Sequence, residues 1–84
     1  MWVIEFSRDA AKALIRMPRH QAMRIRRKID ELVHDPRKAA HVKKLTDYPG
    51  YRLRVGDWRV IYLLHEDRLI VHIVRIASRG EVYK

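Results

Sequence analysis

Apolar residues occupy every second position at the start of the chain and every third or fourth position afterwards. Trp2, Ile4 and Phe6 show the first spacing, which predicts a β-strand over residues 2–6. From residue 8 the spacing becomes helical. The chain is therefore predicted to begin with one strand and to continue with helices.

The first helix is predicted to begin after Ser7, a good capping residue, and to end before Pro18. Proline lacks an amide donor and clashes with the preceding turn, so it ends a helix. Ala11, Leu14 and Ile15 share one face of this helix.

A second helix is predicted over residues 19–33, because its apolar residues form one stripe and Asp35-Pro36 follows as a stop. The stripe consists of Ala22, Ile25, Ile29, Leu32 and Val33. The remaining surface is basic and carries Arg19, His20, Arg24, Arg26, Arg27 and Lys28. Two interpretations stay open: a contact with nucleic acid or the ribosome, and an ordinary solvated helix face.

Residues 37–50 are predicted to be a connector. Leu45 is expected to insert under the sheet, and residues 47–50, Asp-Tyr-Pro-Gly, predict a turn. Lys44 and its neighbours add positive charge to this segment.

Residues 51–62 predict a β-hairpin with a two-residue turn at Gly56-Asp57, since glycine tolerates the positive φ of such turns. This register places Arg54 opposite Arg59. One face of the hairpin is apolar and carries Leu53, Val55, Trp58, Val60 and Tyr62. The other face carries Arg52, Arg54, Arg59 and Ile61.

Three arginines on one sheet face call for an explanation, because like charges opposite each other are destabilising. A bound anion would compensate them, and RNA phosphate is the leading candidate. The alternative is that all three arginines are solvated, since open antiparallel sheets often have one wet face.

A further strand is predicted over residues 69–76. Pairing Leu64 with Leu69 would place His72 beside Ile61, on the arginine face. The order of strand, two helices and three strands predicts an α+β fold with helices on one face of a mainly antiparallel sheet.

Length and composition change this picture little. The 84 residues predict a single domain over residues 1–84. The formal net charge of +9 favours polyanionic partners. The chain has no cysteine, which suits a reducing cytoplasm, and we expect neither a signal peptide nor a membrane span.

At this point the sequence resembles the RelE/ParE toxin superfamily of type II toxin–antitoxin systems. The resemblance rests on residues 51–62, Tyr-Arg-Leu-Arg-Val-Gly-Asp-Trp-Arg-Val-Ile-Tyr, followed by residues 79–83, Arg-Gly-Glu-Val-Tyr. It covers nearly the whole chain and is stronger toward the RelE branch, whose members cut mRNA in the ribosomal A site. ParE-branch toxins poison DNA gyrase and generally lack this set of basic residues.

The resemblance implies roles for five residues. Arg52 and Arg54 match positions that contact the mRNA backbone, and Arg59 matches an arginine that stabilises the scissile phosphate. Arg79 matches an arginine that interacts with the leaving group or phosphate, and Tyr83 matches a tyrosine that orients the ribose hydroxyl. Further candidate RNA contacts are Arg24, Arg27, Lys28 and Lys44.

The sequence departs from the family pattern at the expected base. Lysines are usual where Arg52 and Arg54 stand, and arginine is a poor general base because it does not readily lose its proton. Remaining candidates for the base are Tyr83, His72 and Glu81. We expect no metal ion and no other cofactor, since His34 and His41 have no cysteine and no clustered carboxylates near them.

The implied function is that of a ribosome-dependent mRNA endoribonuclease that gives 2′,3′-cyclic phosphate and 5′-hydroxyl ends. The implied partners are the ribosome, mRNA and a RelB-like antitoxin, which would form a hetero-oligomeric complex with the toxin. Two alternatives stay open: a ParE-like inhibitor of DNA gyrase, and a basic toxin-fold binding module whose active site has decayed.

Overall fold

The structure is a computed structural model that describes residues 1–80, and it has the predicted α+β architecture. Its elements are β1 (Val3–Phe6), α1 (Arg8–Arg16), α2 (Arg19–Asp30), the 3₁₀ helix η1 (Glu31–Val33), β2 (Val42–Lys44), β3 (Tyr51–Val55), β4 (Trp58–His65) and β5 (Ile70–Ser78). α2 and η1 together span the predicted second helix, residues 19–33.

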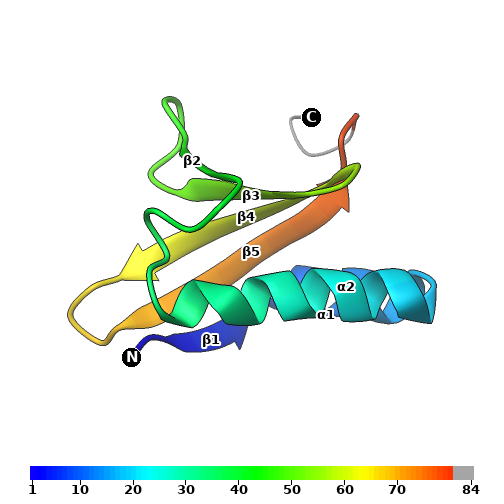
Figure 1. The fold of residues 1–84 in the computed structure, drawn as a ribbon, viewed down its shortest axis with the longest axis horizontal. Helices are drawn as coiled ribbons and strands as arrows, with labels where there is room; N and C mark the ends of the chain where they lie inside the picture. Colours follow the sequence, from blue (N-terminus) through cyan, green and yellow to red (C-terminus); the bar gives the residue numbers. More distant parts are fainter. Residues whose placement is uncertain (81–84) are drawn as a thin grey trace.

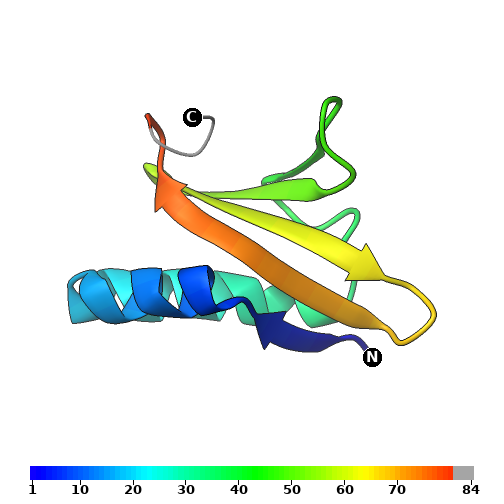
Figure 2. The same cartoon turned by 180° about the vertical axis from the view of Figure 1, so that it is seen from behind.

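The strands form one sheet in the order β1-β5-β4-β3-β2. β1 pairs in parallel with β5, and the other neighbours are antiparallel. Figures 1 and 2 show α1 and α2 lying side by side on one face of this sheet. The opposite face carries no helix in the described part of the chain.

The start of α1 follows the sequence prediction. The Oγ atom of Ser7 accepts a hydrogen bond from the amide of Ala10 at 3.0 Å, as expected of a capping residue. The same hydroxyl donates to the carbonyl of Val74 at 2.7 Å. Ser7 therefore ties the beginning of the helix to β5.

The main core lies between the helices and the sheet. Its buried side chains are Ala10, Met17, Ile25, Ile29, Leu32, Leu53, Val55, Val60, Tyr62, Val71, Ile73 and Ile76. Ile15, on the apolar face noted in the sequence, is 82% exposed. The buried face of α1 is rotated by one position, toward Ala10, Leu14 and Met17, whose spacing also fits a helix.

The predicted connector contains a strand that sequence reasoning missed. β2 pairs with β3 at the edge of the sheet, with Val42 opposite Leu53 and Lys43 opposite Arg52. β2 is only three residues long and carries a single apolar residue, so it gives no alternating pattern to detect. Leu45, just beyond it, packs against Ile61 and Ala77 on the face opposite the helices.

The predicted register between β4 and β5 was also wrong. Tyr62 pairs with Ile73 and Ile61 with Arg75, which leaves Val74 as the extra residue of a β-bulge. Ser7 hydrogen-bonds to the carbonyls of Ile73 and Val74, which stabilises the backbone at this irregularity. As a result Arg75, not His72, lies beside Ile61.

Tyr62 provides a test of the core. Its hydroxyl donates to the carbonyl of Pro36 at 2.5 Å in a buried position. Burial raises the pKa of the Tyr62 phenol, and Tyr51 and Asp35 add to the increase. Tyr62→Phe leaves that carbonyl without its donor, so we expect a loss of about 1–3 kcal/mol in the free energy of unfolding, measured in urea.

Tyr48→Phe is the matched control, because Tyr48 is 39% exposed and its hydroxyl has no comparable buried partner in the described structure. Equal unfolding free energies for the two variants would contradict the structural role assigned to the Tyr62 hydroxyl.

Candidate functional site

The tip of the β3–β4 hairpin brings together residues from distant parts of the sequence. The turn is the one predicted, with Gly56 at φ 58° and Val55 opposite Trp58. The amide of Arg79 donates to the carbonyl of Asp57 at 2.8 Å. This hydrogen bond places the segment after β5 against the hairpin turn.

Arg59 lies on the face of the hairpin opposite the core, directly across from Arg54, as predicted. Its Nη1 atom donates to the carbonyls of Gly56 at 3.0 Å and Trp58 at 3.1 Å. The two carbonyls hold the guanidinium near the turn and leave its other donors available. Arg54 is exposed, so the pair presents two positive charges to one small region.

A cavity of about 520 Å³ opens beside this turn, and most of the predicted basic residues line it. It is lined by Arg24, Lys28, His41, Arg54, Val55, Gly56, Asp57, Arg59 and Arg79. α2 supplies two of these cations. A Cβ atom on Gly56 would lie 3.2 Å from Nη1 of Arg24, so the helix and the hairpin meet closely here.

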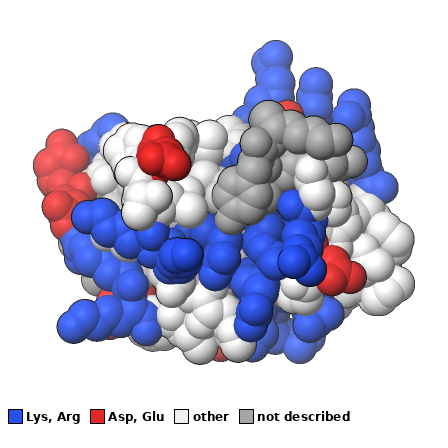
Figure 3. Space-filling model, turned by 90° about the horizontal axis from the view of Figure 1, so that it is seen from above, with Lys and Arg blue, Asp and Glu red and all other residues white. Residues whose placement is uncertain are grey.

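The cavity is strongly positive: five arginine and lysine side chains line it, against one carboxylate. Arginine stays charged and offers a planar set of donors that matches phosphate geometry. Figure 3 shows Lys and Arg side chains gathered in a band across the molecule when it is seen from above. The arrangement suits a polyanion better than a small neutral ligand.

Three predicted residues of the described chain do not line this cavity. Arg52 lies between Lys43 and Ile61 in the sheet, and its Nε atom is buried without a hydrogen-bond partner within residues 1–80. Lys44 lines a different hollow, together with Arg37, and Arg27 is exposed elsewhere on α2. Tyr83, like the alternative base Glu81, lies outside the described residues.

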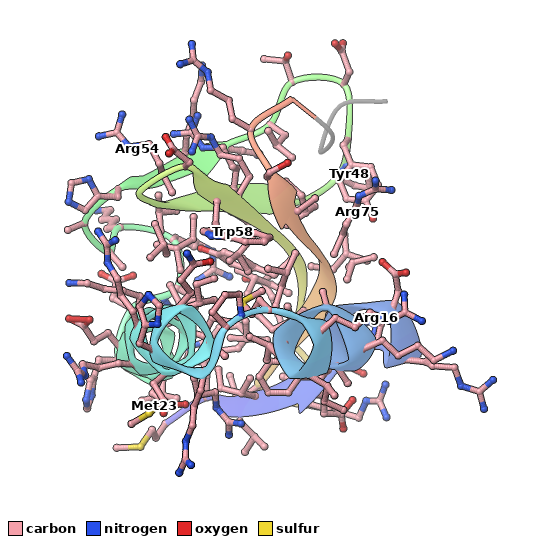
Figure 4. All side chains as sticks on the ribbon, turned by 90° about the vertical axis from the view of Figure 1, so that its right-hand side faces the viewer. Arg16, Met23, Tyr48, Arg54, Trp58 and Arg75 are labelled. Atoms are coloured by element: carbon pink, nitrogen blue, oxygen red, sulfur yellow. The ribbon has the colours of Figure 1, made fainter. Side chains whose placement is uncertain are left out.

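Sequence reasoning also missed the positions of two residues, Arg75 and His41. Arg75 lies opposite Ile61 because of the bulge at Val74, which periodicity cannot reveal. Figure 4 shows Arg54 and Arg75 toward opposite edges of the sheet, with Trp58 between the sheet and the helices. His41 lines the basic cavity, and nothing in its immediate sequence distinguishes it from the other histidines. His72 faces Leu63 instead and does not line the cavity.

The sheet order, the paired helices and the basic hairpin tip define the class of protein: a RelE/ParE-type toxin. A family model described as "ParE toxin of type II toxin-antitoxin system, parDE" matches residues 4–83. The chain therefore belongs to this family and is a toxin of a type II toxin–antitoxin system. No curated protein matches the sequence at a significant level.

Solved structures show the same fold. The chain is similar to the archaeal RelE–RelB complex from Pyrococcus horikoshii OT3, with 28% identity, a TM-score of 0.79, and coverage of 96% of this chain and 98% of that one. It resembles the intact E. coli RelBE toxin–antitoxin complex at 18% identity and a TM-score of 0.81, covering 93% and 96%.

A YoeB/ParE toxin from Agrobacterium tumefaciens matches at 12% identity and a TM-score of 0.77, covering 93% and 98%. The fold is thus common to toxins with different names, so the residues of the site must decide the activity. In the described part of the chain, no helix is long and apolar enough to span a membrane.

Proposed function

We propose that this toxin is a ribosome-dependent mRNA endoribonuclease that inhibits translation. The observation that carries the proposal is the meeting of Arg54, Arg59 and Arg79 in one cavity at the hairpin tip. These arginines come from three different segments, and a solvated surface gives no reason for three like charges to converge. A bound phosphate would be a reason for these three positive charges to lie together.

The reaction would be attack of a ribose 2′-hydroxyl on the adjacent phosphate, giving a 2′,3′-cyclic phosphate and a 5′-hydroxyl. Arg59 is suited to stabilise the phosphorane, because two carbonyls fix its guanidinium before substrate binds. Arg54 and Arg79 would bind the flanking charge, and Arg52 would contact the mRNA backbone beyond the cavity. Tyr83 would orient the attacking hydroxyl.

The ribosome would supply the positioning of the mRNA, which this small domain lacks. Holding the mRNA in line for attack converts a loose encounter into an intramolecular step. Arg24 and Lys28 extend the positive cavity along α2, toward the remaining exposed cations of that helix. Arg27 and Lys44, which lie outside the cavity, would contact ribosomal or messenger RNA further away.

Inhibition of DNA gyrase is the second candidate, and the matching ParE family model is the observation that favours it. Primer extension on cellular mRNA after induction separates the two functions. In-frame cuts support the ribonuclease. Double-strand DNA breaks with intact mRNA would show the gyrase activity, and neither signal would indicate a toxin-fold binding module whose site has decayed.

A RelB-like antitoxin is the proposed partner in a hetero-oligomeric complex. Several similar structures are complexes with RelB antitoxins. In this toxin Ile15 of α1 and Met23 of α2 are exposed, at 82% and 55%, on a protein of net charge +9. An acidic, amphipathic segment would complement both features.

Binding of such an antitoxin should raise the melting temperature of the toxin, because a ligand that binds only the folded state stabilises it. A hundredfold excess over the dissociation constant contributes about 2.7 kcal/mol. Differential scanning fluorimetry of the toxin with and without the product of the adjacent gene measures the shift. Equal melting temperatures, or failure to copurify, would contradict this choice of partner.

A further inference from the structure

The proposed reaction needs a group that accepts the proton of the 2′-hydroxyl, and the arginines of the cavity cannot do so. Lys28 also lines the cavity, but a lysine acts as a base only after it has lost its proton. The other described cavity residues of the types that serve as general bases are His41 and Asp57. Imidazole suits this task better than carboxylate, because a general base works best when its pKa lies near the working pH.

The backbone of His41 is unusual. Its φ is 67°, in the left-handed region that costs free energy for residues other than glycine. The amide of Arg54 donates to the carbonyl of His41 at 3.0 Å, and the amide of Val42 donates to the carbonyl of Ala39 at 3.2 Å. Neighbouring structure therefore holds an unfavourable conformation, which is a common sign of a functional position.

His41 also lies where two hollows meet. The second hollow has a volume of about 240 Å³. It shares two lining residues with the basic cavity, Lys28 and His41. Its apolar part is formed by Leu32, Ala39 and Leu53. A nucleotide whose phosphate occupies the basic cavity and whose base enters the second hollow would have its ribose beside His41.

We propose that His41 is the general base of the ribonuclease reaction, an inference that rests on the proposed function. The neutral imidazole takes the 2′-hydroxyl proton while the bond from O2′ to phosphorus forms. The bond from phosphorus to O5′ then breaks, and the leaving oxygen takes a proton from water. The imidazolium returns its proton to solvent, which restores the enzyme.

Charged side chains from several elements line the two hollows that meet at His41. In the basic cavity they are Arg24, Lys28, Arg54, Asp57, Arg59 and Arg79. In the second hollow they are Glu31, His34 and Asp35. Arg59 and Arg54 bind phosphate in this scheme, while His41 alone changes its protonation state during the reaction.

Two substitutions test the proposal without disturbing the backbone. His41→Asn keeps a residue that tolerates a left-handed conformation but cannot accept the proton, and His41→Gly tolerates that conformation and leaves space. His65→Asn is the matched control, because His65, at the end of β4, lines neither the basic cavity nor the second hollow. Circular dichroism confirms that each variant is folded.

The measurement is single-turnover cleavage on mRNA-programmed ribosomes between about pH 5.5 and 8.5, the range over which imidazole normally titrates. We expect the cleavage rate of the wild type to rise with pH. We expect His41→Asn to cleave about 100- to 10,000-fold more slowly and without that rise. Added imidazole should restore part of the activity of His41→Gly, whereas His65→Asn should behave like the wild type.

Three results would overturn the assignment. A His41→Asn variant with the wild-type rate and pH profile removes His41 from the chemistry while the proposed function stands. Weaker binding with an unchanged rate at saturation, and no rescue by imidazole, shows a binding role only. Absence of cleavage by the wild-type toxin refutes the ribonuclease function itself, and with it the role of His41.

Discussion

Replacing Arg59 with alanine should abolish the toxicity of this protein while leaving its fold intact. Arg59 lies on the sheet face away from the main core, so its loss creates no cavity there. Loss of one charge contact made in the transition state costs roughly 3–4 kcal/mol, on the order of a hundred- to a thousandfold in rate. Growth after induction and cleavage on programmed ribosomes both measure the effect.

Arg68→Ala provides the control, because Arg68 is an exposed arginine of the β4–β5 turn and does not line the basic cavity. It changes the net charge equally and should remain toxic. Arg59→Lys keeps the charge but loses the planar set of donors, so intermediate activity is expected. A folded Arg59→Ala variant as toxic as the wild type would exclude Arg59 from the site.

The arrangement around Arg59 was predictable because its signals are local. A glycine at the turn and alternating side chains fix the register of the hairpin, and that register puts Arg54 across from Arg59. The capping hydroxyl of Ser7 and the stop at Pro36 are equally local, so the helices were also predicted correctly apart from the rotation of α1.

The features that sequence reasoning missed depend on contacts between distant segments. The bulge at Val74 is stabilised by Ser7, which lies 67 positions away in the chain. β2 exists because β3 offers it an edge, and His41 reaches the cavity because Arg54 binds its carbonyl. No window of a few residues contains such information, so the register of β5 and the place of His41 required the structure.

Residues of α2 and of the β3–β4 hairpin line the same cavity. We therefore expect a second large effect, on the affinity for RNA. Arg24 and Lys28 are four residues apart on α2 and both line the basic cavity. Reversing both charges with Arg24→Glu and Lys28→Glu replaces two attractive phosphate contacts by repulsive ones. We expect affinity for programmed ribosomes to fall on the order of a hundredfold at about 0.15 M salt.

Arg8→Glu with Lys12→Glu is the matched control on α1, because it has the same spacing and lowers the net charge equally, from +9 to +5. Neither residue lines the basic cavity, so only the small effect of net charge is expected. An mRNA with a 2′-deoxy nucleotide at the cleavage site keeps the substrate intact during the measurement.

Salt dependence distinguishes a direct contact from a general effect of charge. Each phosphate contact contributes about 0.7 to the slope of log affinity against log salt for single strands, so the α2 variant should lose about 1.4. The difference in affinity between the α2 variant and the α1 variant should shrink as the salt concentration rises. Equal affinities and equal slopes for the two variants would mean that the cavity between α2 and the hairpin does not bind the RNA.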